Sequence, residues 1–209
     1  MKNERYKRTT IDSYDKTAVE YYKLVSEFKL LPEITEFIKI VRKNGKILDL
    51  GCGPGHHSKY FSNLGFDVIG IDLSLEMIKI AKRESIKSVF QVMDILDLNF
   101  EKDTFNGIWA SASLLHVPKS KIKFVLKKLK EILIENGILY ISLKQGEGSE
   151  IFIDNRYGGV EKHYVYYYPE EIEKLLKNVG FNIIEIQPKD KRTIYDTNSW
   201  LHIFCQKIN

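Results

Sequence analysis

Apolar and polar residues alternate along the chain in short blocks that predict strands and helices by turns. Five apolar runs have the length of buried strands: 46–50, 66–72, 88–94, 105–111 and 138–144. Helical periodicity lies between and after them, most clearly at 74–85, 118–135 and 169–179, where apolar residues recur every three or four positions. Strands that alternate with helices form a parallel sheet covered on both faces, so the pattern predicts a doubly wound α/β fold.

The end of the chain departs from this alternation. The segments "FNIIEIQ" (181–187) and "WLHIFCQKI" (200–208) are typical of strands, and residues 188–199 between them have no helical pattern. Because a parallel pair needs a crossover connection, we expect these two strands to pair antiparallel. The stretch 145–168 has no clear periodicity and receives no assignment.

A glycine-rich loop follows the first strand in "ILDLGCGPG". Its glycines are spaced G-x-G-x-G, whereas a dinucleotide fingerprint reads G-x-G-x-x-G and places backbone N–H groups against a pyrophosphate. Pro54 has no N–H to donate, and Asp49, just before the loop, would repel a pyrophosphate. These features suit a ligand that carries adenosine and an amino-acid ammonium group but no phosphate, a description that S-adenosylmethionine fits.

Two more acidic residues close the next two strands. Asp72 ends the second strand, where an acidic residue accepts hydrogen bonds from ribose hydroxyls, and Asp94 ends the third, where it could accept from an adenine amino group. Any one of these acids alone would be explained as an ordinary loop residue. Three acids at the ends of three successive strands favour a ligand site.

The motifs "DLGCGPG", "GIDLS" and "MDILDLNF" followed by "FNGIWASASLLHV" resemble, in this order, the class I S-adenosylmethionine-dependent methyltransferases of the small, single-domain bacterial type. The resemblance covers residues 14–207. It implies one domain over residues 1–209 and a seven-stranded sheet in the order 3-2-1-4-5-7-6 with an antiparallel last strand. It also implies S-adenosylmethionine as the cofactor and S-adenosylhomocysteine as its product.

The same resemblance implies the residues of the cofactor site. The glycine loop and Asp49 would hold the methionine end, the acids at 72 and 94 the ribose and adenine, and a helix over residues 12–28 would close over the cofactor. Packing within that helix explains its tyrosines equally well. The implied cofactor residues are Tyr14, Tyr22, Asp49, Gly51, Cys52, Gly53, Gly55, Asp72, Leu73, Met77, Asp94, Ile95 and Ser111.

The methyl acceptor is not encoded in these motifs, because methyl transfer asks the protein mainly to align a nucleophile and remove a proton. His116, after the fourth strand, is the candidate general base or hydrogen-bond partner, although a polar loop histidine is the competing explanation. Two candidate arginines could clamp an anion or simply lie on the surface. The candidate acceptor-side residues are Arg156, Tyr164, Tyr166, Arg192 and Trp200. We predict that 145–168 caps the acceptor pocket.

Composition narrows the class of acceptor and partner. The cysteines, Cys52 and Cys205, are far apart, which argues against a disulfide framework or a cysteine metal site and favours the cytoplasm; no metal is predicted. The net charge of +4 is small for a nucleic-acid-binding protein. We expect no signal peptide and no membrane span, because no apolar run approaches about 18 residues. A small molecule methylated on oxygen, nitrogen or sulfur is the expected acceptor.

Two other functions stay open. The fold also suits an RNA methyltransferase or an RNA-binding module, and lysines recur through residues 119–130, although a solvated helix face explains them. The chain could also bind the cofactor without catalysing a reaction. The sequence is compatible with a monomer or a homodimer.

Overall fold

The computed structural model describes residues 2–26, 32–190 and 198–208. The α-helices are α1 (Lys2–Ser26), α2 (Pro32–Ile40), α3 (His56–Asn63), α4 (Leu75–Glu84), α5 (Lys119–Ile132) and α6 (Pro169–Val179). The strands are β1 (Lys46–Leu50), β2 (Asp67–Asp72), β3 (Val89–Val92), β4 (Phe105–Ser111), β5 (Leu133–Gln145), β6 (Ser149–Asp154), β7 (Val160–Tyr167), β8 (Phe181–Lys189) and β9 (Trp200–Lys207). Two short 3-10 helices, η1 (Leu114–His116) and η2 (Asn155–Tyr157), complete the chain.

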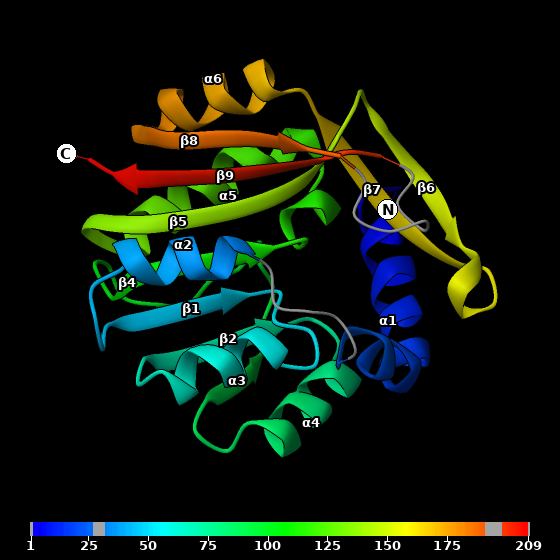
Figure 1. Ribbon diagram of the computed structural model, residues 1–209. Coiled ribbons are helices and arrows are strands. Elements are labelled where there is room, and N and C mark those ends of the chain that lie inside the picture. The colour runs from blue at the N-terminus through cyan, green and yellow to red at the C-terminus, as the bar shows by residue number, and fades with distance from the viewer. Residues whose placement is uncertain (1, 27–31, 191–197, 209) are drawn as a thin grey trace.

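The main sheet confirms the predicted topology. Strands β3, β2, β1, β4 and β5 lie side by side and parallel, β9 pairs antiparallel with β5, and β8 pairs antiparallel with β9 (Figure 1). With β8 and β9 counted as strands six and seven, this is the order 3-2-1-4-5-7-6. The carboxyl ends of the parallel strands therefore meet at one edge, where doubly wound sheets bind ligands.

Two apolar clusters hold the helices on the sheet. On one face, Phe37 of α2 and Phe61 of α3 surround Trp109, whose ring stacks on Tyr140 at 3.8 Å between centroids. On the other face, α5 and α6 pack on alternate residues of the same strands, including Leu48, with no exposed surface. Buried apolar side chains of this size contribute roughly 1.5–3 kcal/mol each, so the edge that carries the site rests on a rigid frame.

One expected turn lies inside a strand. Asn136-Gly137 reads as a turn before the fifth strand, but β5 begins earlier and runs through it. The pairing of β5 with β4 shifts there, and Asn136 has a φ of 62°. The turn chemistry therefore produces an irregularity in a continuous strand rather than its beginning.

The unassigned stretch 145–168 forms an antiparallel hairpin of β6 and β7, linked by η2. This hairpin joins the sheet through β7, whose Tyr166 and Tyr167 pair in parallel with Lys144 and Gln145 at the end of β5. The hairpin thus stands at the carboxyl edge of the sheet and projects away from it (Figure 1).

Helix α1 is longer at its start than the segment 12–28 suggested, and residues 27 and 28 lie outside the described part of the chain. It runs beside β7 and reaches the end of α4 that faces the sheet edge (Figure 1). In the described ranges, none of the helices combines the length and the apolar character needed to cross a bilayer.

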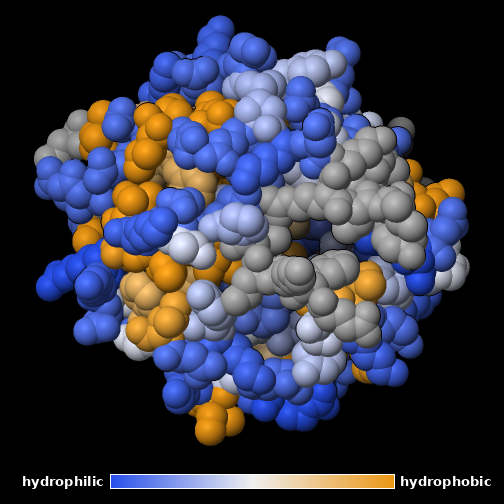
Figure 2. Space-filling model, in the orientation of Figure 1, coloured by the Kyte–Doolittle hydropathy of each residue, from blue (hydrophilic) through white to orange (hydrophobic). Residues whose placement is uncertain are grey.

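Figure 2 shows that hydrophilic residues cover most of one face of the molecule. Hydrophobic residues gather on the side where α2, β8 and β9 lie, and Ile40 and Ile184 are among the exposed apolar side chains there. Exposed apolar residues are normal on the surface of a folded domain.

Candidate functional site

A cavity of about 830 Å³ lies at the carboxyl edge of the sheet. The ends of β1, β2, β4 and β5 form one side of it, and α1 and the β6–β7 hairpin form the other. Ten of the predicted cofactor residues line it: Tyr14, Gly51, Cys52, Gly53, Asp72, Leu73, Met77, Asp94, Ile95 and Ser111. A single cavity therefore joins the predicted cofactor residues to the hairpin.

The glycine loop needs its glycines for two different reasons. Gly51 has a φ of 73°, and a Cβ there would lie 2.4 Å from Cβ of Ser113, so the loop passes close to the chain after β4. Gly53 has a φ of 52°, and a Cβ there would have only Tyr21 nearby, at 3.9 Å. Both need the left-handed backbone conformation that glycine adopts freely, and Gly53 leaves open space on its cavity side.

Asp72 lies at the end of β2 and holds the loop in place. One carboxylate oxygen accepts a hydrogen bond from the N–H of Gly53 and the other from the N–H of Ser74, both at 2.9 Å. Burial raises the pKa of Asp72, while these backbone hydrogen bonds oppose that rise. Each carboxylate oxygen keeps acceptor capacity for one more donor, as a pair of ribose hydroxyls requires.

Asp94 lies beyond β3 and already has two partners. It accepts a hydrogen bond from the N–H of Leu96 at 2.9 Å and forms an ion pair with Lys7 of α1. A ligand amino group at Asp94 would therefore share this carboxylate with Lys7. The sequence pattern did not point to Lys7, because a lysine near the start of a polar helix carries no signal of its own.

Asp49 and Gly55 do not line the cavity but lie behind the glycine loop. Asp49 accepts a 2.6 Å hydrogen bond from the hydroxyl of Ser58 in α3, and burial raises its pKa to about 7. A Cβ on Gly55 would lie 2.9 Å from Cβ of Ala81 in α4. Both residues therefore support the loop and its helix, and the structure offers no direct contact between Asp49 and a ligand in the cavity.

The helix tyrosines divide between the cavity and the surface. Tyr14 and Tyr21 line the cavity, with their rings 5.8 Å apart. Tyr22 does not line it, and its hydroxyl faces Glu84 of α4. The structure thus brings Tyr21, rather than Tyr22, to the predicted cofactor residues.

His116 ends η1 and faces α1 across the cavity. Its Nδ1 lies 2.8 Å from the carbonyl oxygen of His163, which can only accept, so Nδ1 carries the hydrogen. Its Nε2 then accepts from the hydroxyl of Tyr14 at 3.1 Å. Burial lowers the pKa of His116 to about 4, so the ring stays neutral.

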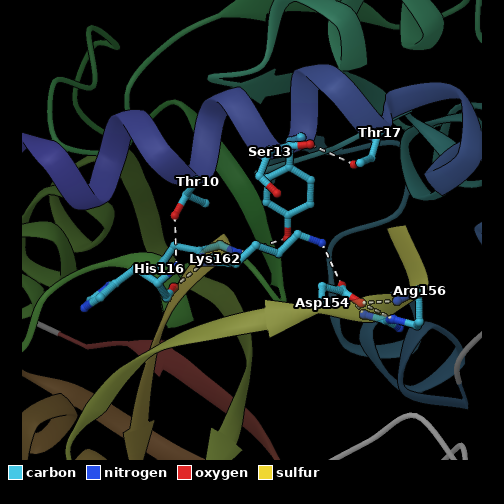
Figure 3. A network of polar contacts seen from close by, with 9 residues as sticks. Thr10, Ser13, Thr17, His116, Asp154, Arg156 and Lys162 are labelled. Carbon is cyan, nitrogen blue, oxygen red and sulfur yellow. Dashed lines mark hydrogen bonds and ion pairs between the residues drawn. The ribbon is translucent and has the colours of Figure 1, made fainter. Parts of the chain in front are cut away.

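A polar cluster around the buried Asp154 and Lys162 lies beside this pair, and Figure 3 shows it beneath α1. Asp154 accepts two hydrogen bonds from Arg156, at 2.8 and 2.7 Å, and one from Lys162 at 2.9 Å. Burial alone would raise the pKa of Asp154, but these two cations outweigh it and lower the pKa to about 2. Lys162 and Arg156 both line the cavity.

Tyr164 and Trp200 line the cavity on its hairpin side, as does Lys144. The ammonium group of Lys144 lies 5.2 Å from the ring centroids of both Tyr164 and Trp200. Tyr166 does not line the cavity, and its hydroxyl donates to Glu150 at 2.5 Å. Arg192 lies outside the described residues.

Polar groups outside the set of predicted cofactor residues also line the cavity near the glycine loop. The indole N–H of Trp109 donates to Nδ1 of His57 at 3.1 Å, so the hydrogen of that neutral ring lies on Nε2. Oγ of Ser113 and Nδ1 of His56 are buried without a hydrogen-bond partner in the part of the chain that the structure describes. His56, His57 and Ser113 line the cavity, so their polar groups are available to a ligand there.

Metal-binding residues do not gather at the site. Among the described residues, no three histidine, cysteine, aspartate or glutamate side chains lie close enough together to hold a metal ion. The groups that converge on the cavity suit hydrogen bonding and charge pairing.

A family profile described as a methyltransferase domain matches residues 25–186. Among curated relatives, the chloroplastic tocopherol O-methyltransferase of Arabidopsis thaliana is 38% identical over 107 residues, which are 48% of this chain and 30% of that protein. The chain spans less than two thirds of the length of the first curated relatives that it matches.

Solved structures share the fold. The 1,6-didemethyltoxoflavin-N1-methyltransferase of Burkholderia thailandensis, solved with its substrate and S-adenosylhomocysteine, is 17% identical with a TM-score of 0.78 and covers 99% of this chain and 90% of its own. The [4+2]-cyclase SpnF is 16% identical with a TM-score of 0.74, and 95% of each chain is covered. From the family profile and the sheet topology together, this chain belongs to the class I S-adenosylmethionine-dependent methyltransferases, whose cofactor is the one that the glycine spacing predicted.

Proposed function

We propose that this chain transfers a methyl group from S-adenosylmethionine to an oxygen, nitrogen or sulfur atom of a small-molecule acceptor. The observation that carries this proposal is the shared cavity, which is lined by the glycine loop and Asp72 and also by Tyr14, His116 and the hairpin. Methyl transfer requires donor and acceptor in one enclosed space with the nucleophile in line.

The residues present fit the cofactor. Gly53 leaves open space where a side chain would stand, and Asp72 retains acceptor capacity for ribose hydroxyls. The unpartnered hydroxyl of Ser113 and the N–H of His57 could serve the amino-acid end, together with the N-terminus of α3, which has no side-chain cap. When bound, S-adenosylmethionine supplies an electrophilic methyl group on a sulfonium.

The acceptor half of the cavity supplies the remaining requirement, a path for the acceptor's proton. The hydroxyl of Tyr14 donates to Nε2 of His116, so an acceptor O–H that donates to the oxygen of Tyr14 would be connected to that ring nitrogen. His116 would take the proton through Tyr14 as the new bond forms. Because burial holds the pKa of His116 near 4, we assign it to late proton acceptance rather than to full deprotonation of the acceptor beforehand.

The relatives support a small acceptor, since the names of the tocopherol and didemethyltoxoflavin enzymes refer to small molecules. RNA is the weaker alternative, because none of the α5 residues described here lines the cavity. The two cysteines are buried and free, which suits the reducing cytoplasm. Either a monomer or a homodimer is compatible with this proposal.

Calorimetry tests the cofactor. We expect S-adenosylmethionine and S-adenosylhomocysteine to bind and NAD to give no measurable heat, because Pro54 in the glycine loop has no N–H to donate to a pyrophosphate. Binding of NAD without the adenosyl ligands would contradict the proposal.

A transfer assay tests the reaction, since the cyclase SpnF has this fold as well. The protein is incubated with methyl-labelled cofactor and either cell metabolites or total tRNA. Label in a small molecule is the expected result. Label only in tRNA would favour the RNA alternative, and cofactor binding with no labelled product would favour a non-methylating role.

A further inference from the structure

The cluster of Asp154, Lys162 and Arg156 carries one more positive charge than negative charge. Lys162 is 1% exposed and Arg156 is 30% exposed at the side chain, and both pair with the same carboxylate, itself 1% exposed. No second carboxylate pairs with either cation within the described residues. The excess positive charge thus lies on Arg156, which stays open to the cavity, and on the buried Lys162, so an anion in the cavity would compensate it.

Aromatic rings provide part of that compensation. The ammonium group of Lys162 lies 4.6 Å from the ring centroid of Tyr14 and 4.8 Å from that of Tyr157. The guanidinium of Arg156 lies 5.4 Å from the ring of Tyr157. Ring faces attract cations but carry no net charge, so the cluster remains positive and suited to an anion.

The cluster lies between the two halves of the cavity. On one side Tyr157 lies 6.2 Å from Tyr21, the residue nearest to the open space at Gly53. On the other side Lys162 faces the ring of Tyr14, which bonds to His116. An anion bound by the cluster would therefore lie near the place in the cavity where the methyl group is transferred.

We propose that this cluster binds an acidic group of the methyl acceptor, so that the acceptor is a carboxylate or a phosphate ester. This inference rests on the proposed function for the existence of an acceptor. Nε and one terminal nitrogen of Arg156 bond to Asp154, and the guanidinium keeps further N–H donors for a second anion. Asp154 fixes the plane of that guanidinium and so directs its free edge.

The carboxylate of the cofactor could also pair with this cluster, but the structure offers that carboxylate a different set of donors. The uncapped N-terminus of α3, Nε2–H of His57 and the hydroxyl of Ser113 come from the sheet side of the glycine loop. The cluster comes from the hairpin, where Lys162 lies over the rings of Tyr14 and Tyr21 of α1. We therefore assign the anion bound by the cluster to the methyl acceptor and not to the cofactor.

The test uses simple anions on the protein saturated with S-adenosylhomocysteine. Calorimetry at constant ionic strength compares benzoate and inorganic phosphate with neutral benzamide. We expect at least one anion to bind about fivefold or more tightly than benzamide, and Arg156→Gln to abolish that preference. Arg8→Gln, which removes the same charge from the exposed outer side of α1 (side chain 87% exposed), should retain it.

Two results would overturn the inference. One is equal or weaker binding of both anions relative to benzamide by the wild type. The other is an Arg156→Gln variant that loses affinity for S-adenosylhomocysteine but not for 5′-methylthioadenosine, which would assign the arginine to the cofactor's carboxylate. Arg156→Lys, which keeps the charge but not the planar fork, provides a second folded variant and should retain part of the preference.

The titrations are repeated without any adenosyl ligand. Failure of S-adenosylhomocysteine to bind would contradict the proposed function, while the comparison of benzoate with benzamide would still decide whether the cluster prefers anions.

Discussion

Asp72 is the residue on which cofactor affinity should depend most. We expect Asp72→Ala to weaken binding of S-adenosylhomocysteine at least about tenfold, because hydrogen bonds to a charged group contribute roughly 1.5–3 kcal/mol each. The same change also frees the N–H groups of Gly53 and Ser74. Calorimetry measures the affinity.

Asp67→Ala is the matched control for Asp72, since Asp67 begins the same strand with a 63% exposed side chain and only a 3.7 Å pair with Lys46. It should leave affinity unchanged. An Asp72→Ala variant with wild-type affinity and an intact fold would remove this residue from the site.

The burial of His116 predicts how the free energy of unfolding depends on pH. Burial lowers its folded pKa from 6.5 to about 4, so the unfolded chain binds the proton first as pH falls. The neutral ring therefore contributes its full stability above pH 6.5 and loses it between pH 6.5 and pH 4, with a slope of about 1.4 kcal/mol per pH unit.

Urea unfolding of wild type and His116→Gln across that window tests this. The variant should lose less stability than the wild type as pH falls, since other titrating groups are common to both. Equal slopes would show that His116 is not held neutral by burial.

At single residues, the sequence predicts which side chains reach the cavity where a motif fixes the backbone, but not where the face of a helix decides. The glycines and Asp72 follow from strand ends and spacing. Tyr21 and Tyr22 are neighbours on one helix, about 100° apart around its axis, and nothing in a polar helix says which one faces the cavity. Lys162 and Asp154 were missed because their contact depends on the pairing of two strands that the sequence left unassigned.

The strands and helices of the alternating pattern were predictable, since buried parallel strands are apolar throughout. The β6–β7 hairpin was not, because its inward face is built from Lys162, Tyr164 and Asp154 rather than from aliphatic residues. Four glycines at 146, 148, 158 and 159 also interrupt its periodicity.

Shortening the β6–β7 hairpin should separate cofactor binding from methyl transfer. In its register Glu150 pairs with Tyr164, so residues 151–163 can be replaced by an Asn-Gly turn that suits a two-residue connection. We expect affinity for S-adenosylhomocysteine to survive within a few fold, because Gly51, Gly53 and Asp72 lie on the sheet edge and not on the hairpin. Methyl transfer should fall by roughly a hundredfold or more as the acceptor wall is lost.

Ile153→Thr is the control for this replacement, since Ile153 is 56% exposed on the hairpin. It should preserve both cofactor binding and transfer. Full transfer activity in the shortened protein would mean that the acceptor is recognised by His116 and the sheet edge alone.

The whole molecule has a modest net charge of +4, and the α5 lysines do not line the cavity. We therefore expect no specific binding to tRNA at about 0.15 M salt, where surface charges more than about 8 Å apart are largely screened. A gel-shift titration checks this, and Lys123→Gln with Lys127→Gln should leave methyl transfer unchanged. Tight tRNA binding that falls steeply with salt and with this double change would contradict a small-molecule acceptor.

Helix α1 contacts both the cofactor side and the acceptor side of the cavity. Asp15 accepts a 2.6 Å hydrogen bond from Ser74, and Lys7 pairs with Asp94, on the cofactor side. Thr10 accepts from the N–H of His163 on the acceptor side. These contacts attach one helix to both sides of the cavity, so a displacement of α1 would open both sides together. We therefore expect the turnover of the proposed reaction to have an upper limit set by how often this helix leaves the sheet edge.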